Sequence, residues 1–132
     1  MTTVQVSLRI WGDAPAIAAL RNLGLGEVWA KGDPVPGSPV MLRKEGGWEL
    51  HSELTQDHEL EEQLGSLLRR LHGCWPELVS AATFGGAELS VALFVGRGAQ
   101  PAVRLNAEQV RALAEIGADL DLDLFNWERT PI

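Results

Sequence analysis

The sequence predicts a single α+β domain over residues 1–132, with one mixed sheet of about five strands and two to three helices packed on one face. Three observations predict this class. The length suits one domain. Segments of alternating apolar and polar residues, typical of strands, are interspersed with segments of helical periodicity. The apolar fraction of 45% and the charged fraction of 22% are those of an average globular protein.

The first predicted elements are a strand and a short helix. Residues 4–11 alternate between apolar and polar side chains, as in a half-buried strand. Asp13 is suited to cap the helix that follows, Pro15 falls in its first turn, and Gly24 ends it. The apolar face of the strand comprises Val4, Val6, Leu8 and Ile10.

An extended segment and a long loop come next. Residues 27–33 form the extended segment, and residues 34–39 contain three prolines and one glycine, which prevent regular strand pairing. Strand character resumes at residues 47–52. We expect this strand to pair with a short strand at residues 41–43, so that the loop bulges from the middle of the fold.

Two further helices are predicted. The most regular helical pattern covers residues 57–72, where leucines recur at steps of three and four. We expect Gly73 to end this helix and Trp75-Pro76 to prevent another from starting. The next helix begins after Asn106 as its N-cap and ends at Gly117. Its predicted inward residues are Val110, Leu113 and Ala114.

Two more strands complete the predicted sheet. Residues 88–95 are mostly apolar, as in an interior strand, and residues 119–125 alternate Asp and Leu up to a final Phe. A strand and helix between residues 7 and 24 are echoed between residues 90 and 117. The sequence therefore predicts two βαβ-like halves that share one sheet.

Five short segments follow one another along most of the chain: Ser7-Leu8-Arg9-Ile10 with Gly12-Asp13, Trp29-Ala30-Lys31-Gly32-Asp33, Gly47-Trp48-Glu49-Leu50, Leu67-Leu68-Arg69-Arg70-Leu71 and Leu120-Asp121-Leu122-Asp123-Leu124-Phe125. In this order they resemble a bacterial family known as domain of unknown function four-two-seven-nine. The resemblance implies a compact α+β fold in the bacterial cytoplasm and brings no established catalytic residues. As a class, small acidic domains of this kind resemble the immunity proteins that accompany bacterial toxins.

Composition excludes several classes of partner and location. A net charge of −7 repels the phosphate backbone, so we expect no nucleic-acid partner. No apolar run is long enough to span a bilayer, and the N-terminus lacks the pattern of a signal peptide. Cys74, the only cysteine, allows no internal disulfide, which favours a reducing cytoplasm. The oligomeric state is not indicated.

An acidic segment is the strongest candidate for a partner-binding surface. Between Glu45 and Leu68 there are seven acids and no Lys or Arg. Acids in the first turn of a helix also favour its dipole, which explains part of the cluster structurally. The acids that precede the helix gain nothing from that dipole, so a negative surface for a basic partner is the alternative interpretation. The seven acids are Glu45, Glu49, Glu53, Asp57, Glu59, Glu61 and Glu62.

A second candidate is a small pocket that combines aromatic, cationic and acidic side chains. Its residues are Trp29, Lys31, Asp33, Arg43 and Trp48. The alternative is structural: both tryptophans anchor the core, while the segment from Lys31 to Asp33 forms a turn.

No catalytic residue, cofactor or metal site is predicted. Asp119, Asp121 and Asp123 lie about 7 Å apart on one strand face, but a metal site needs ligands that converge from several elements, so a solvated face is the preferred interpretation. The three histidines lack zinc-site spacing, and Cys74 and the serines lack the companions of a nucleophile.

The leading functional prediction is therefore a non-enzymatic binding protein, specifically an immunity protein that neutralises a basic bacterial toxin through an acidic surface. The alternative is a small-molecule-binding sensor or enzyme that uses the pocket near Trp29, Lys31, Asp33 and Trp48.

Overall fold

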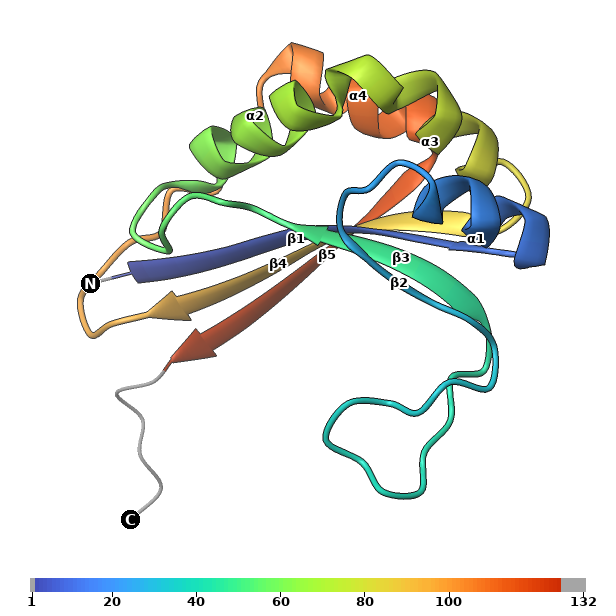
Figure 1. The fold of residues 1–132 in the computed structure, drawn as a ribbon. Helices are drawn as coiled ribbons and strands as arrows, with labels where there is room; N and C mark the ends of the chain where they lie inside the picture. The colour runs from blue at the N-terminus through green and yellow to red at the C-terminus, as the bar shows by residue number, and fades with distance from the viewer. Residues whose placement is uncertain (1, 127–132) are drawn as a thin grey trace.

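The protein consists of a mixed five-stranded sheet with its helices packed on one face (Figure 1). The computed structural model describes residues 2–126. The elements in chain order are β1 (Thr2–Gly12), α1 (Ala14–Arg21), β2 (Glu27–Trp29), β3 (Gly46–His51), α2 (Leu60–Leu71), a 3-10 turn (His72–Cys74), α3 (Trp75–Ala82), β4 (Gly86–Val95), α4 (Ala107–Ile116) and β5 (Ala118–Asn126). The predicted α+β class with a single mixed sheet is confirmed.

The strand order is β2-β3-β1-β4-β5. β3 runs antiparallel to both β1 and β2, so β1 and β2 run in the same direction with β3 inserted between them. β4 is antiparallel to β1, and β5 lies parallel beside β4. The units β1-α1-β2 and β4-α4-β5 are therefore the two predicted βαβ-like halves, the first split by β3.

The core lies between the sheet and the helices, because the apolar residues that alternate along each strand point to the helix-covered face. Leu8 and Ile10 are 1% and 0% exposed on the helix-facing side of β1. Trp48 from β3 is fully buried among them, and its indole N–H donates to the backbone oxygen of Leu25 at 2.7 Å. This bond satisfies the polar atom that burial of a tryptophan would otherwise leave without a partner. The face of the sheet opposite the helices is consequently left for the polar residues of each strand.

The expected pairing of residues 41–43 with the following strand is wrong. β3 pairs instead with β1 and β2, while Leu42 forms an isolated bridge with Pro34. Backbone bonds from Val35 N to Met41 O and from Arg43 N to Asp33 O, at 3.0 and 2.7 Å, hold this segment to the proline-rich stretch itself. The prolines restrict regular pairing but leave enough donors for a narrow hairpin-like arm.

The expectation that Trp75-Pro76 prevents a helix is also wrong, because α3 begins there with Pro76 in its first turn. A proline at this position costs no hydrogen bond, since the first N–H groups of a helix have no partner within it. In α4, Leu113 is buried as expected, but Val110 is 52% exposed and Ala114 is exposed. Gln109 takes the inward position instead, and its side-chain amide donates to Glu61 O at 2.8 Å.

Candidate functional site: the open face of the sheet

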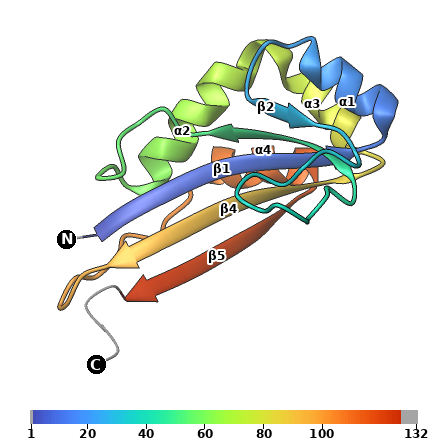
Figure 2. The same cartoon turned by 60° about the horizontal axis from the view of Figure 1, so that its bottom comes forward.

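The side of the sheet opposite the helices, which comes forward in Figure 2, is called the open face below. It carries most of the charged side chains of the strands. On β1, Arg9 alternates with the buried Leu8 and Ile10. On β4, Glu88 lies between Ala87 and Leu89, which are 3% and 0% exposed. Successive strand residues point to opposite faces, so Arg9 and Glu88 both lie on the open face.

The register of the strands aligns five charged residues across the whole sheet. Glu27 pairs with Glu49, Glu49 with Arg9, Arg9 with Glu88, and Glu88 with Asp119, so each strand contributes one. At the usual separation of neighbouring strands, this charged row extends over roughly 19 Å. In strand order the charged row reads Glu27, Glu49, Arg9, Glu88 and Asp119. Four of its five members are acids.

Glu49 forms the centre of a local hydrogen-bonding network. Its carboxylate pairs with Arg9 Nε, accepts from Ser7 Oγ at 3.2 Å, and lies 3.1 Å from His51 Nε2. The Glu49 side chain is only 12% exposed, although it lies on the open face. Glu49 is one of the acids predicted from the sequence, whereas Ser7 and Arg9 were not predicted, because their proximity to Glu49 depends on a pairing across about 40 residues.

The acids nearer the β5 edge have no such partners. Among residues 2–126, no ion pair involves Glu88, Asp119, Asp121 or Asp123. The open-face positions of the described strands hold six acids and one arginine, which places most of the chain's formal net charge of −7 on this face. The six acids are Glu27, Glu49, Glu88, Asp119, Asp121 and Asp123.

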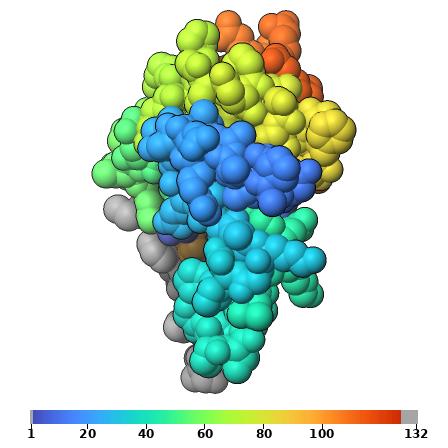
Figure 3. Space-filling view, turned by 45° about the vertical axis from the view of Figure 1, so that its right-hand side comes forward, coloured from blue at the N-terminus to red at the C-terminus, as the bar shows by residue number. Residues whose placement is uncertain are grey.

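Residues 30–45, called the arm below, project on the same side as the open face (Figures 1 and 2). A bond from Gly32 N to Arg43 O at 2.8 Å closes its base. The space-filling view shows the arm protruding from the body beneath α1 (Figure 3). On the arm, Val40, Met41 and Leu42 are 83%, 59% and 60% exposed, so three consecutive apolar side chains are accessible to a partner.

The residues of the predicted pocket separate in the structure. Trp48 lies in the core, whereas Trp29 lies on the opposite side of β3, against Gly47, with the Arg43 guanidinium stacked 4.2 Å from its ring centroid. Asp33 accepts a turn-forming bond from Ala30 N at 2.8 Å. Lys31 lines a cleft beside α1.

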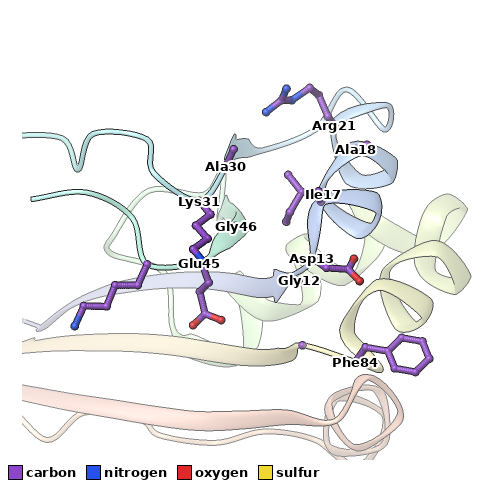
Figure 4. Close-up of a pocket in the computed structure, with 13 residues that line it drawn as sticks. Gly12, Asp13, Ile17, Ala18, Arg21, Ala30, Lys31, Glu45, Gly46 and Phe84 are labelled. Atoms are coloured by element: carbon purple, nitrogen blue, oxygen red, sulfur yellow. The ribbon is translucent and has the colours of Figure 1, made fainter.

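That cavity is a half-open cleft of about 670 Å³ between α1 and the base of the arm (Figure 4). Figure 4 shows Asp13, Ile17 and Arg21 on the α1 side and Lys31 and Glu45 on the other. Lys44 also lines the cleft. The lining thus combines apolar side chains with three cations and two acids, and the slight excess of positive charge suits a small organic anion.

The acidic segment between Glu45 and Glu62 is divided between different parts of the fold. Glu45 lines the cleft, Glu49 lies on the open face, and Glu53 accepts from Ser66 and pairs with Arg70. Glu59 and Glu62 form a capping box at the start of α2, and Glu61 pairs with Arg104 at 2.6 Å. Asp57 accepts from the Thr55 hydroxyl, which lowers the pKa of that carboxyl. Most of these acids therefore have local structural partners.

The open face does not form the geometry of a familiar catalytic triad. Ser7 Oγ and His51 Nε2 both contact Glu49, so the carboxylate lies between serine and imidazole. Activation of a serine requires the imidazole to lie between the serine and the carboxylate. Within residues 2–126 no group of three His, Cys, Asp or Glu side chains could hold a metal ion, Asp119, Asp121 and Asp123 included. Cys74 on the helix side is partly buried, which raises the pKa of its thiol.

Comparison with known proteins gives one family and no closer relative. None of the helices in the described part of the chain is long and apolar enough to cross a membrane. No match was found among curated proteins or solved structures. The family model for the domain of unknown function DUF4279 matches residues 2–127, almost the whole chain. The chain therefore belongs to the DUF4279 family.

Proposed function

We propose that this domain is a non-enzymatic binding protein that holds a basic protein partner on the open face, and that it acts as an immunity protein against a basic bacterial toxin domain. The observation that carries the proposal is the charged row, in which four acids and one arginine are aligned across all five strands. The toxin-neutralising role is proposed by analogy, because small acidic domains resemble immunity proteins as a class.

The arrangement of charge supports a partner of opposite sign. Glu88 and Asp119 are register partners on adjacent strands, and among residues 2–126 neither forms an ion pair, although Arg9, which pairs with Glu49, is the register neighbour of Glu88 on β1. Like charges at such positions destabilise an isolated sheet, so their retention is explained if lysine or arginine of a partner fills the space between them. A negative surface also speeds the encounter with a positive partner.

The arm supports a partner of protein size. The arm, which carries the exposed Val40, Met41 and Leu42, projects on the same side of the sheet as the acids, and the Trp29–Arg43 stack lies at its base. Protein interfaces combine a few aromatic, arginine and apolar anchors with a polar surround. A small cation would use the acids but would leave this apolar surface uncovered.

The proposal is tested by co-expression with the product of the adjacent gene in the source genome, the expected toxin. The wild-type domain should restore growth of cells that express the toxin. The double variant Glu88→Gln/Asp119→Asn should bind the toxin at least about tenfold more weakly in calorimetry, equivalent to about 1.4 kcal/mol. The matched control Glu77→Gln/Glu108→Gln removes the same charge from exposed positions on α3 and α4.

The control should keep wild-type affinity. If both double variants weaken binding equally, total charge rather than the open face is responsible, and the proposed surface is wrong. If the adjacent gene product neither binds nor inhibits growth, the immunity role is wrong.

One observation favours the second candidate, a small-molecule-binding sensor or enzyme. Lys31 lines the cleft of about 670 Å³ together with Arg21 and Lys44, and their positive charge suits a small organic anion. The candidate site is therefore this cleft and not a pocket around Trp48. A thermal-shift screen with carboxylates and phosphates tests this candidate. A ligand that raises the Tm of the wild type but not of Lys31→Met would support it, and no shift with any compound would count against it.

A further inference from the structure

The outer edge of β5 has the properties of a strand-binding site. β5 runs over nine residues, Ala118–Asn126, and is in continuous register with β4 on one side. Within residues 2–126 no strand pairs with its other side, because β5 ends the strand order. An edge strand of this length presents a row of backbone N–H and C=O groups that can pair with another extended segment.

The two faces of β5 are chemically distinct. Asp119, Asp121 and Asp123 lie on the open face, in register with Glu88, Ser90 and Ala92. On the other face lie leucines, in register with the buried Leu89, Val91 and Leu93 of β4. The exposed fractions of these leucines are 46% for Leu120, 43% for Leu122 and 68% for Leu124. A strand added at this edge would cover them.

The edge carries few of the features by which proteins prevent strand addition. Such features include charged side chains, of which β5 has three aspartates, as well as proline, bulges and a covering helix or loop. Residues 118–126 contain no proline, glycine, lysine or arginine, and their register with β4 is uninterrupted. The aspartates are the only charged residues on this edge, so they decide which strands can approach.

The aspartates argue against a second copy of the chain as the occupant. When two β5 strands pair with their faces aligned, each row of aspartates lies against the other, at a cross-strand separation of about 5 Å. A shift by one residue places aspartates beside leucines and removes the match of apolar faces. Both arrangements are unfavourable, so the edge selects a strand of different composition.

We infer that β5 accepts an extended strand of the basic partner by β-augmentation, with Lys or Arg at alternate positions opposite the aspartates and apolar residues opposite the leucines. This inference rests on the proposed function and specifies how the partner binds. The backbone ladder provides affinity that tolerates sequence variation, and the alternation of charge and apolar side chains provides selectivity.

The probe for this inference is a blocked heptapeptide in which Lys and Val alternate. It should bind the full chain, protect β5 amides from hydrogen exchange and perturb the NMR signals of residues 119–125. A peptide of the same composition with lysines and valines in separate blocks should bind at least about tenfold more weakly, since it cannot match both faces. N-methylation of every backbone amide should abolish binding, because the peptide then has no N–H donor on either edge to form the ladder.

A charge exchange supplies an independent readout. The variant Asp121→Lys/Asp123→Lys should lose affinity for the Lys-Val peptide and gain affinity for a peptide of alternating Glu and Val, because opposite charges on paired strands attract and like charges repel. Equal binding of the N-methylated peptide would overturn strand addition while leaving an acidic binding face intact. Absence of binding by the Lys-Val peptide would also overturn it, while the adjacent-gene experiment would still decide the proposed function.

Discussion

Glu88 on β4 and Asp119 on β5 are register partners on adjacent parallel strands, and both side chains lie on the open face. Cross-strand like charges destabilise a sheet by up to about 1 kcal/mol. The proximity of the two carboxylates is therefore unfavourable in the isolated domain and becomes favourable once a cation of a partner approaches. Asp121 and Asp123, which form no ion pair among residues 2–126, extend the acidic surface along the same edge of the sheet.

Removal of either charge should stabilise the free protein. We expect Glu88→Gln and Asp119→Asn each to raise the free energy of unfolding by about 0.2–1 kcal/mol, measured by urea denaturation. The double variant should gain less than the sum of the single variants, because either substitution relieves the same repulsion. Strictly additive gains, or a loss of stability in both single variants, would show that the two carboxylates do not interact.

Position 85 should tolerate no residue larger than glycine. A Cβ atom at this position would lie 1.8 Å from the backbone oxygen of Trp11, so the chain would have to move. Gly85→Ala should reduce the free energy of unfolding by at least about 1–3 kcal/mol. Gly73→Ala is the matched control, since a Cβ there meets no atom within 4 Å, and its effect should stay within about 1 kcal/mol. Similar losses in both variants would contradict this packing.

Trp48 should contribute far more to stability than Trp29. Trp48 is 0% exposed and its indole N–H donates to Leu25 O, whereas Trp29 is partly exposed on the other side of β3. Trp48→Ala should cost about 3–5 kcal/mol of unfolding free energy because it leaves a cavity and an unpaired carbonyl. Urea denaturation of Trp48→Ala and Trp29→Ala compares them directly, and an equal or larger loss for Trp29→Ala would show that the core assignment is wrong.

Cys74 should react slowly while the protein is folded. Burial, and secondarily the nearby Glu77, raise the pKa of its thiol, so less of the reactive thiolate is present near neutral pH. Alkylation by iodoacetamide at pH 7.5 should be slower in the native protein than in urea, and should accelerate as the pH rises. A native rate equal to that of the unfolded chain would contradict the shielded environment of this thiol.

Local patterns predicted the elements that depend on neighbouring residues. The alternation of Val4, Val6, Leu8 and Ile10 places them all in the core, and the spacing of leucines identifies α2. The same local signals were ambiguous at Trp75-Pro76, because proline both begins and interrupts helices. Burial of Gln109 in place of Val110 depends on its bond to Glu61 in another helix, which periodicity does not contain.

The charged row could not be predicted, because strand register joins segments far apart in the chain. The sequence places Glu49 in one acidic segment and the Asp119–Asp123 alternation in another, but nothing local indicates that Arg9 and Glu88 lie between them. One signal was present: each of these residues occupies the polar position of an alternating strand. Comparison of those positions across all strands would have indicated one acidic face.

Carboxyl footprinting with and without the adjacent gene product shows which carboxylates the partner covers. Carbodiimide-coupled labelling followed by mass spectrometry measures the accessibility of each carboxylate. We expect binding to protect Glu88, Asp119, Asp121 and Asp123 from labelling, while Glu77 and Glu108 on the helix side remain labelled. Protection confined to Glu77 and Glu108, or to Asp13 and Glu45 in the cleft, would contradict this expectation.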